Sequence, residues 1–304
     1  MTNTFQTFEY KIKNESICIE SCISAGTIAE IPERIEGYPV VEIASYAFST
    51  SGNTISNRLA GERLEEIILP KTVKKIGRYA FYNCRNLQRI SFYNTLTDLG
   101  AGAFTGCHRV KEIQVTFLEN KQSILREFLI ELPEEQMVTI SFEDGYAKIM
   151  FPEFFEESIE NTPARNLEVF THGSGMLYRN CFVKKELSFS LYDERFGWAR
   201  GKEFPETLFE LAFQRLLFPY QLTEKAEKRY LDFLKEYLQK CTKWAVDNEK
   251  EKELFFLADH FSDEVQDLDM MISVAGAKGN PTILSYLMDK KHQRFKVKRK
   301  MFEL

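Results

Sequence analysis

The feature that most constrains this sequence is a stretch, residues 64–116, that repeats itself every 23 residues. Ile67, Ile90 and Ile113 hold the same place in three copies of one apolar pattern, and another apolar side chain follows each of them two residues later. A period in the twenties with alternating apolar side chains predicts short strands stacked as a solenoid, because a single copy leaves its apolar row in water. We therefore expect these three isoleucines to form one buried column.

A second motif lies between the predicted strands and has the same period. Gly77 and Gly100 are each followed by Ala three residues later and by Phe four residues later, and then by Cys84 or Cys107. We expect the Phe side chains to enter the core and the Ala positions to require small residues where adjacent coils press together. The two cysteines are expected to be buried structural thiols, since a small apolar group suits that repeat position.

These repeated residues resemble those of the BspA-type leucine-rich repeat. The matching residues are Ile76, Gly77, Ala80, Phe81, Cys84, Leu87, Ile90 and Phe92 in one coil, and Leu99, Gly100, Ala103, Phe104, Cys107, Val110, Ile113 and Val115 in the next. The resemblance covers about residues 5–116 and implies a leucine-rich-repeat solenoid there. The sequence departs from the family pattern at Tyr93 and Thr116, where proline is usual, and in an insertion at about residues 49–61.

The segments on either side of the repeat are expected to close it. Residues 5–24 alternate between apolar and polar side chains, which predicts a hairpin that covers the first coil. Apolar residues at helical spacing predict a helix at about 121–132 that covers the last coil. Beyond it we expect a hairpin of residues 137–142 and 147–151, a short acidic helix at 153–160 and a strand at 167–170.

From about residue 203 onward the apolar pattern is helical. The last helical pair, around Gly279-Asn280-Pro281, resembles the helix pair of an ankyrin repeat, although the usual Thr-Pro-Leu-His opening is absent. The sequence therefore predicts an α+β chain: a short leucine-rich-repeat β-solenoid, a small α+β connector and an α-helical, ankyrin-like C-terminal domain. The expected bounds of these three parts are 1–120, 121–202 and 203–304.

Composition and charge restrict the partner and the compartment. A hydrophobic content of 44% is enough for packed cores, which argues against a disordered chain. A formal net charge of -5 argues against nucleic acid as the main partner. The first residues lack the basic and apolar regions of a signal peptide, and no apolar stretch is long enough to span a bilayer. We therefore expect a cytoplasmic protein, although many relatives of this repeat type are surface proteins.

The outward side of the predicted strands is the main candidate binding site. Side chains that alternate with the buried isoleucines would form a mixed-charge ladder, and repeat proteins bind partners on such faces. Arg89 and Tyr93 are of the residue types that often dominate binding energy. The expected partner-binding residues are Glu66, Ile68, Arg89, Ser91, Tyr93, Glu112 and Gln114. The sequence thus predicts a non-enzymatic protein-interaction module for an unidentified protein, and the alternative is an ordinary solvated sheet face.

Two other functions stay open at this stage. A hydrolase or transferase could be centred on His172, Ser174 and Cys181, because a serine or thiol nucleophile needs a nearby imidazole; the alternative is a glycine turn between strands. Nucleic acid or anionic lipid could bind the basic end of the chain, where cations also suit a helix C-terminus. The basic residues there are Lys290, Lys291, Arg294, Lys296, Lys298, Arg299 and Lys300. The histidines show no metal-ligand spacing, and we expect no cofactor.

Overall fold

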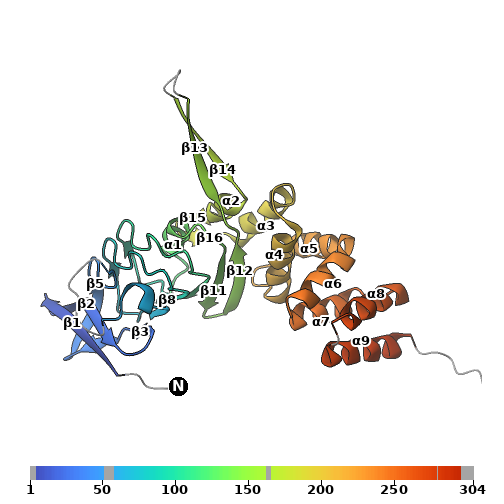
Figure 1. Cartoon of the computed structure of the whole chain (residues 1–304), viewed down its shortest axis with the longest axis horizontal. Coiled ribbons are helices and arrows are strands. Elements are labelled where there is room, and N and C mark those ends of the chain that lie inside the picture. Colours follow the sequence, from blue (N-terminus) through green and yellow to red (C-terminus); the bar gives the residue numbers. More distant parts are fainter. Residues whose placement is uncertain (1–4, 51–57, 162–165, 279, 296–304) are drawn as a thin grey trace, which may run out of the picture. The chain divides into compact units, whose positions relative to one another are not determined.

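The chain folds into two compact units in a computed structural model, and each unit is considered by itself (Figure 1). The structure describes residues 5–50, 58–161, 166–278 and 280–295. The first unit, Met1–Glu203, contains the β-sheets, and the second unit, Phe204–Leu304, is helical. The predicted α+β class, with a β-solenoid before a helical C-terminal region, is therefore confirmed. The predicted division into three parts stays a prediction.

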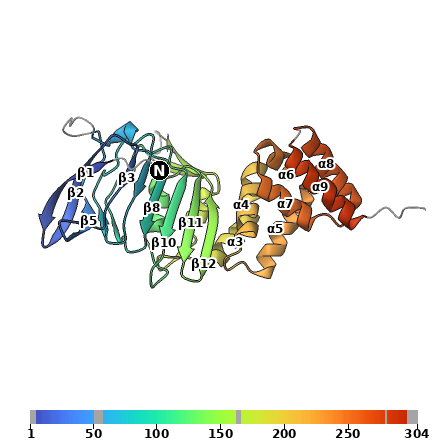
Figure 2. The same ribbon diagram turned by 90° about the horizontal axis from the view of Figure 1, so that it is seen from below.

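One long sheet of the solenoid, which we call the long sheet, contains the predicted strand rows (Figure 2). Its strands, in spatial order, are β12 (Gly145–Phe151), β11 (Gln136–Phe142), β10 (Glu112–Thr116), β8 (Arg89–Tyr93), β6 (Glu66–Ile68) and β3 (Ile28–Glu30). Neighbouring strands are parallel except β11 and β12. Ile67, Ile90 and Ile113 are register partners and are fully buried, so the predicted apolar column is confirmed. Ala29 and Val138 extend that column in both directions.

A second sheet joins the opposite sides of the coils. Its strands, in spatial order, are β1 (Gln6–Lys13), β2 (Ser16–Ser24), β5 (Tyr38–Ile43), β7 (Lys75–Ile76) and β9 (Asp98–Leu99), and β4 (Arg34–Ile35) pairs with β5. The hairpin predicted for residues 5–24 is confirmed, since β1 and β2 pair antiparallel. Because β2 also pairs in parallel with β5, the hairpin continues the ladder at its first coil. A short 3-10 helix, η1 (Gly61–Arg63), lies between β5 and β6.

Phenylalanine rings stack through the core from coil to coil. The centroids of Phe48 and Phe81 lie 5.1 Å apart, those of Phe81 and Phe104 lie 5.1 Å apart, and those of Phe104 and Phe128 lie 5.0 Å apart. Offset aromatic pairs at such distances add to the free energy gained by burying the rings. The predicted entry of the Gly-x-x-Ala-Phe segments into the core is therefore confirmed.

The thiols of the two repeat cysteines are buried, and each donates a hydrogen bond to the preceding coil. The Cys84 Sγ donates to the Phe48 carbonyl oxygen at 3.2 Å, and the Cys107 Sγ donates to the Phe81 carbonyl oxygen at 3.1 Å. The neighbouring Cys84 side chain and burial raise the pKa of the Cys107 thiol, so that thiol stays protonated at neutral pH. Their predicted structural role is confirmed by this burial and by these contacts.

A helix replaces the glycine turn in the last coil. The helix α1 (Leu125–Glu131) places Phe128 on the phenylalanine stack, and the Glu131 carboxylate accepts from Gly102 N at 2.8 Å and from Phe104 N at 3.0 Å. The helix predicted at about 121–132 is confirmed. The ladder continues past it, however, because β11 pairs in parallel with β10 and β12 then pairs antiparallel with β11.

The acidic helix predicted for residues 153–160 is wrong. This segment is the strand β13 (Phe155–Asn161), which pairs antiparallel with β14 (Asn166–His172) to form a two-stranded ribbon. Glutamates favour a helix locally, but the ladder to β14 satisfies the backbone of β13 from outside the segment. The strand predicted at 167–170 is confirmed as part of β14. The unit then ends with α2 (Gly175–Arg179), β15 (Phe182–Val183), β16 (Glu186–Leu187) and α3 (Phe189–Ala199).

A buried arginine of α2 joins the last coil to the base of this ribbon. The Arg179 guanidinium is fully buried and donates to the carbonyl oxygens of Leu129 at 2.6 Å, Leu132 at 2.9 Å, Glu134 at 2.8 Å and Pro152. Leu129 and Leu132 lie at the C-terminal end of α1, where helix carbonyls lack intrahelical partners. Burial lowers the pKa of Arg179 to about 10, so the side chain is still charged at neutral pH.

The second unit is built from consecutive helices that pack as pairs (Figure 1). The helices are α4 (Pro205–Leu217), α5 (Glu224–Glu236), α6 (Leu238–Asp247), α7 (Glu251–His260), α8 (Val265–Gly276) and α9 (Pro281–Arg294). The helix α6 contacts α7 and α8, and α9 contacts α7 and α8, so equivalent helices of successive pairs lie side by side. This packing is consistent with an ankyrin-like region, but the assignment to that repeat stays a prediction.

Candidate functional site

All seven predicted binding residues lie on the outward face of the long sheet. They alternate along β6, β8 and β10 with the buried column, which turns them away from the core. The register aligns Glu66, Arg89 and Glu112 in one row and Ile68, Ser91 and Gln114 in a second, and Tyr93 pairs with Thr116 in a third. The structure therefore places these side chains on one continuous surface, which we call the strand face.

The Arg89 guanidinium is held in place within its row. Its Nε and Nη2 donate to the Glu66 Oε2 at 3.0 Å and 2.7 Å, and Glu112 is its register partner on the other side. The hydrogen bond that Arg89 donates to Glu66 raises the pKa of Arg89, which stays fully charged. Opposite charges on adjacent strands favour the pairing, so Arg89 presents a fixed orientation.

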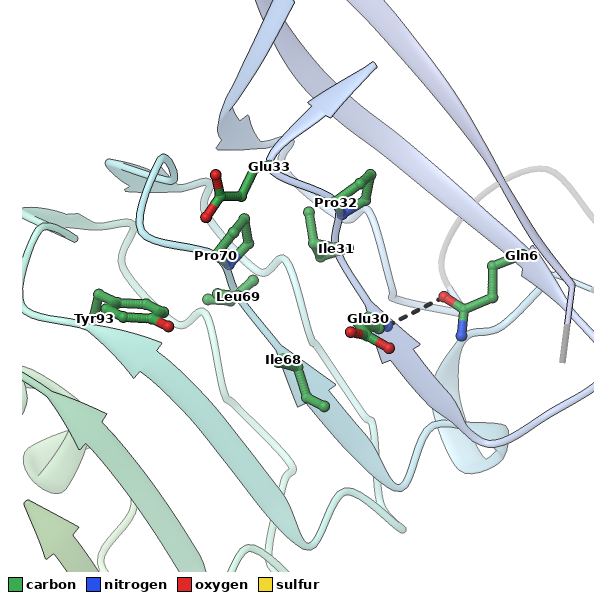
Figure 3. A pocket seen from close by; sticks show the side chains of 9 residues that line it. All are labelled: Gln6, Glu30, Ile31, Pro32, Glu33, Ile68, Leu69, Pro70 and Tyr93. Carbon is green, nitrogen blue, oxygen red and sulfur yellow. Dashed lines mark hydrogen bonds between the residues drawn. The ribbon is translucent and has the colours of Figure 1, made fainter. Parts of the chain in front are cut away.

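A hollow of about 460 Å³ opens beside the strand face, where β3, β6 and β8 end (Figure 3). Its apolar wall consists of Ile31, Pro32, Ile68, Leu69 and Pro70. Tyr93 lies on one side of it, and the polar residues Gln6, Glu30 and Glu33 lie around the rest. Of these nine residues, the sequence prediction named Ile68 and Tyr93. The one sequence signal was the departure from the family pattern at Tyr93, where an aromatic ring takes the place of proline.

Polar contacts around the hollow fix its shape and leave the Glu30 and Glu33 carboxylates accessible. The Gln6 side-chain amide forms two hydrogen bonds with the backbone of β3: its Nε2 donates to Ile28 O at 2.8 Å and its Oε1 accepts from Glu30 N at 3.1 Å. Glu33 and Lys71 form an ion pair at 3.5 Å with both side chains about half exposed, an arrangement that contributes little free energy. The hollow therefore combines apolar walls, a tyrosine and two accessible carboxylates.

Among the described residues, no hydrogen bond joins His172, Ser174 and Cys181, the three residues of the predicted catalytic alternative, to one another. His172 lies on β14, where its Nε2 is 3.1 Å from the Glu157 Oε2 and its ring stacks on Phe155 at 4.5 Å. Ser174 and Cys181 are fully buried, and the Cys181 Sγ donates to the Leu177 carbonyl oxygen. Burial raises the pKa of the Cys181 thiol to about 11, so it is protonated and shielded from a substrate at neutral pH.

The basic end of the chain is described only in part. Lys290, Lys291 and Arg294 form ion pairs with Asp259, Asp269 and Asp263 of the same helical unit. Lys296, Lys298, Arg299 and Lys300 lie outside the described residues. Within the described part of the chain, no helix has the length and apolar character needed to cross a membrane. The roles of the basic end and the cytoplasmic location stay predictions.

Stacked strand-and-turn coils with this register define a leucine-rich-repeat solenoid. Residues 52–162 match the family model described as the BspA type leucine rich repeat region, with six copies. The chain therefore carries a BspA-type leucine-rich-repeat region, as the resemblance in the sequence predicted. The match extends beyond residue 116, in agreement with the continuation of the ladder through β11 and β12.

Three solved structures resemble parts of the chain. A leucine-rich repeat protein from Bacteroides ovatus is 23% identical over 37% of this chain, with a TM-score of 0.29, and the match spans 30% of that protein. The T. pallidum leucine-rich repeat protein is 21% identical over 45% of this chain and 80% of its own, with a TM-score of 0.23. A leucine-rich cell surface protein from Faecalibacterium prausnitzii is 16% identical over 47% of this chain and 44% of its own, with a TM-score of 0.27. No curated protein matched the chain.

Proposed function

We propose that this chain is a non-enzymatic protein-binding module that docks its partner on the strand face. The observation that carries the proposal is that Ile68 and Tyr93 belong both to the strand face and to the hollow. The charged strand face is thereby continuous with the concave surface of the hollow. Repeat solenoids bind partners on such surfaces, and the small number of coils implies an interface of modest area.

The hollow suits one cationic side chain of the partner. The aliphatic stem of a lysine or arginine would pack on Pro32, Pro70 and Ile68, and its charged end would meet the carboxylates of Glu30 and Glu33. The Tyr93 ring offers a further contact to a cation. We therefore expect the partner to present a basic residue at the centre of its contact with this face.

The test replaces Tyr93 with alanine and Glu30 with lysine in the full chain. Both changes remove contacts that a cationic anchor would make, so we expect capture of partner proteins from native lysate to fall at least about tenfold. Because Glu30 is exposed and Tyr93 is partly exposed, the melting temperature should stay within a few degrees. Quantitative mass spectrometry of the captured proteins measures the first effect, and thermal unfolding followed by circular dichroism measures the second.

A matched control makes the same kinds of change away from the strand face. It combines Tyr38→Ala on the second sheet with Glu227→Lys on α5, and it should capture the same proteins as the unmodified chain. Equal capture by the Tyr93→Ala, Glu30→Lys variant and the unmodified chain would rule out the strand face as the binding site. An equal loss in the control would show that the effect is not specific to that face.

A further inference from the structure

The ribbon of β13 and β14 leaves four apolar side chains about half exposed. Phe155 is 59% exposed, Ile159 48%, Val169 52% and Phe170 45%. Figure 1 shows the ribbon with no other strand beside it, and within the described residues β13 and β14 pair only with each other. A two-stranded ribbon is marginally stable in water by itself. Exposed apolar clusters on such an element mark an interaction surface.

Three of these apolar residues lie on the same face of the ribbon. The register pairs Phe155 with His172, Glu157 with Phe170 and Ile159 with Glu168. Directly opposed residues of antiparallel strands share a face, and the stacking of Phe155 on His172 agrees with this assignment. The face thus alternates apolar and acidic side chains along its length.

The base of the ribbon is firmly attached to the solenoid. Phe154 is buried, its N donates to the Pro133 carbonyl oxygen at 3.0 Å, and the Arg179 guanidinium lies 4.8 Å from the centre of its ring. Gly173, with φ +79°, allows the close approach to Glu153, since a Cβ there would lie 2.7 Å from the Glu153 carbonyl oxygen. The ribbon is therefore an exposed element on a fixed base.

The charge of the ribbon indicates what would cover it. Residues 153–172 contain five glutamates and one arginine, and three of the glutamates, Glu156, Glu157 and Glu160, are on β13. Two copies of so acidic a segment repel each other, which disfavours pairing between ribbons of two chains. A cationic segment would be attracted to the same edge.

We propose that the ribbon binds an extended cationic segment of a protein partner, which adds as a third strand along β13. The free edge of β13 supplies backbone hydrogen-bonding groups, as in other cases of strand addition. Lysine or arginine of the added strand would oppose Glu156 and Glu157, and apolar residues would oppose Phe155 and Ile159. The third strand converts a marginal ribbon into a stable three-stranded sheet. This surface is separate from the strand face.

The test uses the full chain and a synthetic peptide of nine residues centred on Val-Lys-Lys-Lys-Val, which can place valine opposite Phe155 and Ile159 and lysine opposite Glu156 and Glu157. A second peptide has glutamate in place of lysine. We expect the lysine peptide to bind and to slow amide hydrogen exchange of residues 155–161, and the glutamate peptide not to bind. The variant Glu156→Lys, Glu157→Lys should weaken binding of the lysine peptide at least about tenfold. A second variant, Phe155→Ser with Ile159→Ser, keeps the charge and should weaken binding as well.

The control variant Glu227→Lys, Asp232→Lys makes the same change of charge on exposed positions of α5 and should bind the peptide as the unmodified chain does. Equal peptide binding by the ribbon variants and the control would overturn the proposal. So would protection that appears only outside residues 155–161. Concentration-dependent dimerisation that both ribbon variants abolish, measured by sedimentation, would assign the edge to a second copy of the chain and would also overturn it.

Discussion

Replacing Arg179 with methionine is expected to lower the free energy of unfolding of the first unit by about 3–5 kcal/mol. The guanidinium is fully buried and donates to four carbonyl oxygens, which lie at the end of α1 and just after β12. Methionine has a similar length but no donor, so it would leave those buried carbonyls without partners. For a unit of this size, the melting temperature should fall by roughly 10 °C.

Chemical unfolding followed by circular dichroism measures this loss, and two further variants define its cause. Arg179→Lys keeps the charge but lacks the planar guanidinium group. Its free energy of unfolding should therefore lie between those of Arg179→Met and the unmodified chain. Arg126→Met removes a neighbouring arginine that is partly exposed and donates to Arg179 O and the Asn180 Oδ1, and it should cost about 1 kcal/mol or less. If Arg179→Met and Arg126→Met unfolded at the same denaturant concentration, the buried network would not hold the last coil.

The solenoid was predictable because its core depends on spacing alone. Alternation along a strand decides which side chains are buried, and the fixed period aligns Ile67, Ile90 and Ile113 across coils without any long-range information. The same periodicity placed the predicted binding residues on one face, because they alternate with the buried column. The position of the strand face therefore followed from the sequence, whereas its role in binding is still a proposal.

The features that the sequence did not reveal depend on contacts between distant segments. Arg179 is charged and lies outside the repeated segment, so the sequence around it predicts an exposed side chain. The ribbon strand β13 reads as an acidic helix until its partner β14 is known. The hollow gathers Gln6, Glu30 and Tyr93 from strands far apart in the chain, and only the coil register brings them together. In each case tertiary contacts outweigh local preference.

Replacing Gly100 with alanine is expected to destabilise the solenoid by roughly 3 kcal/mol, because successive coils touch at this position. A Cβ at Gly100 would lie 2.5 Å from the Gly77 carbonyl carbon and 2.8 Å from the Arg78 Cα, which are backbone atoms of the preceding coil. Gly77 stands in the same relation to Ala44, whose carbonyl carbon would lie 2.7 Å from a Cβ there. Backbone atoms cannot rotate away as a side chain can, so the coils would have to separate.

The matched control is Gly197→Ala in α3, where a Cβ would meet no atom within 4 Å. Alanine favours a helix over glycine by about 0.5–1 kcal/mol, so this variant should be slightly more stable than the unmodified chain. The same substitution is thus expected to have opposite signs at the two positions, and thermal unfolding of the three proteins measures both. Equal stability of Gly100→Ala and the unmodified chain would mean that the coils can separate without loss. In that case the close approach of coils would not explain the place of the repeated glycine in the motif.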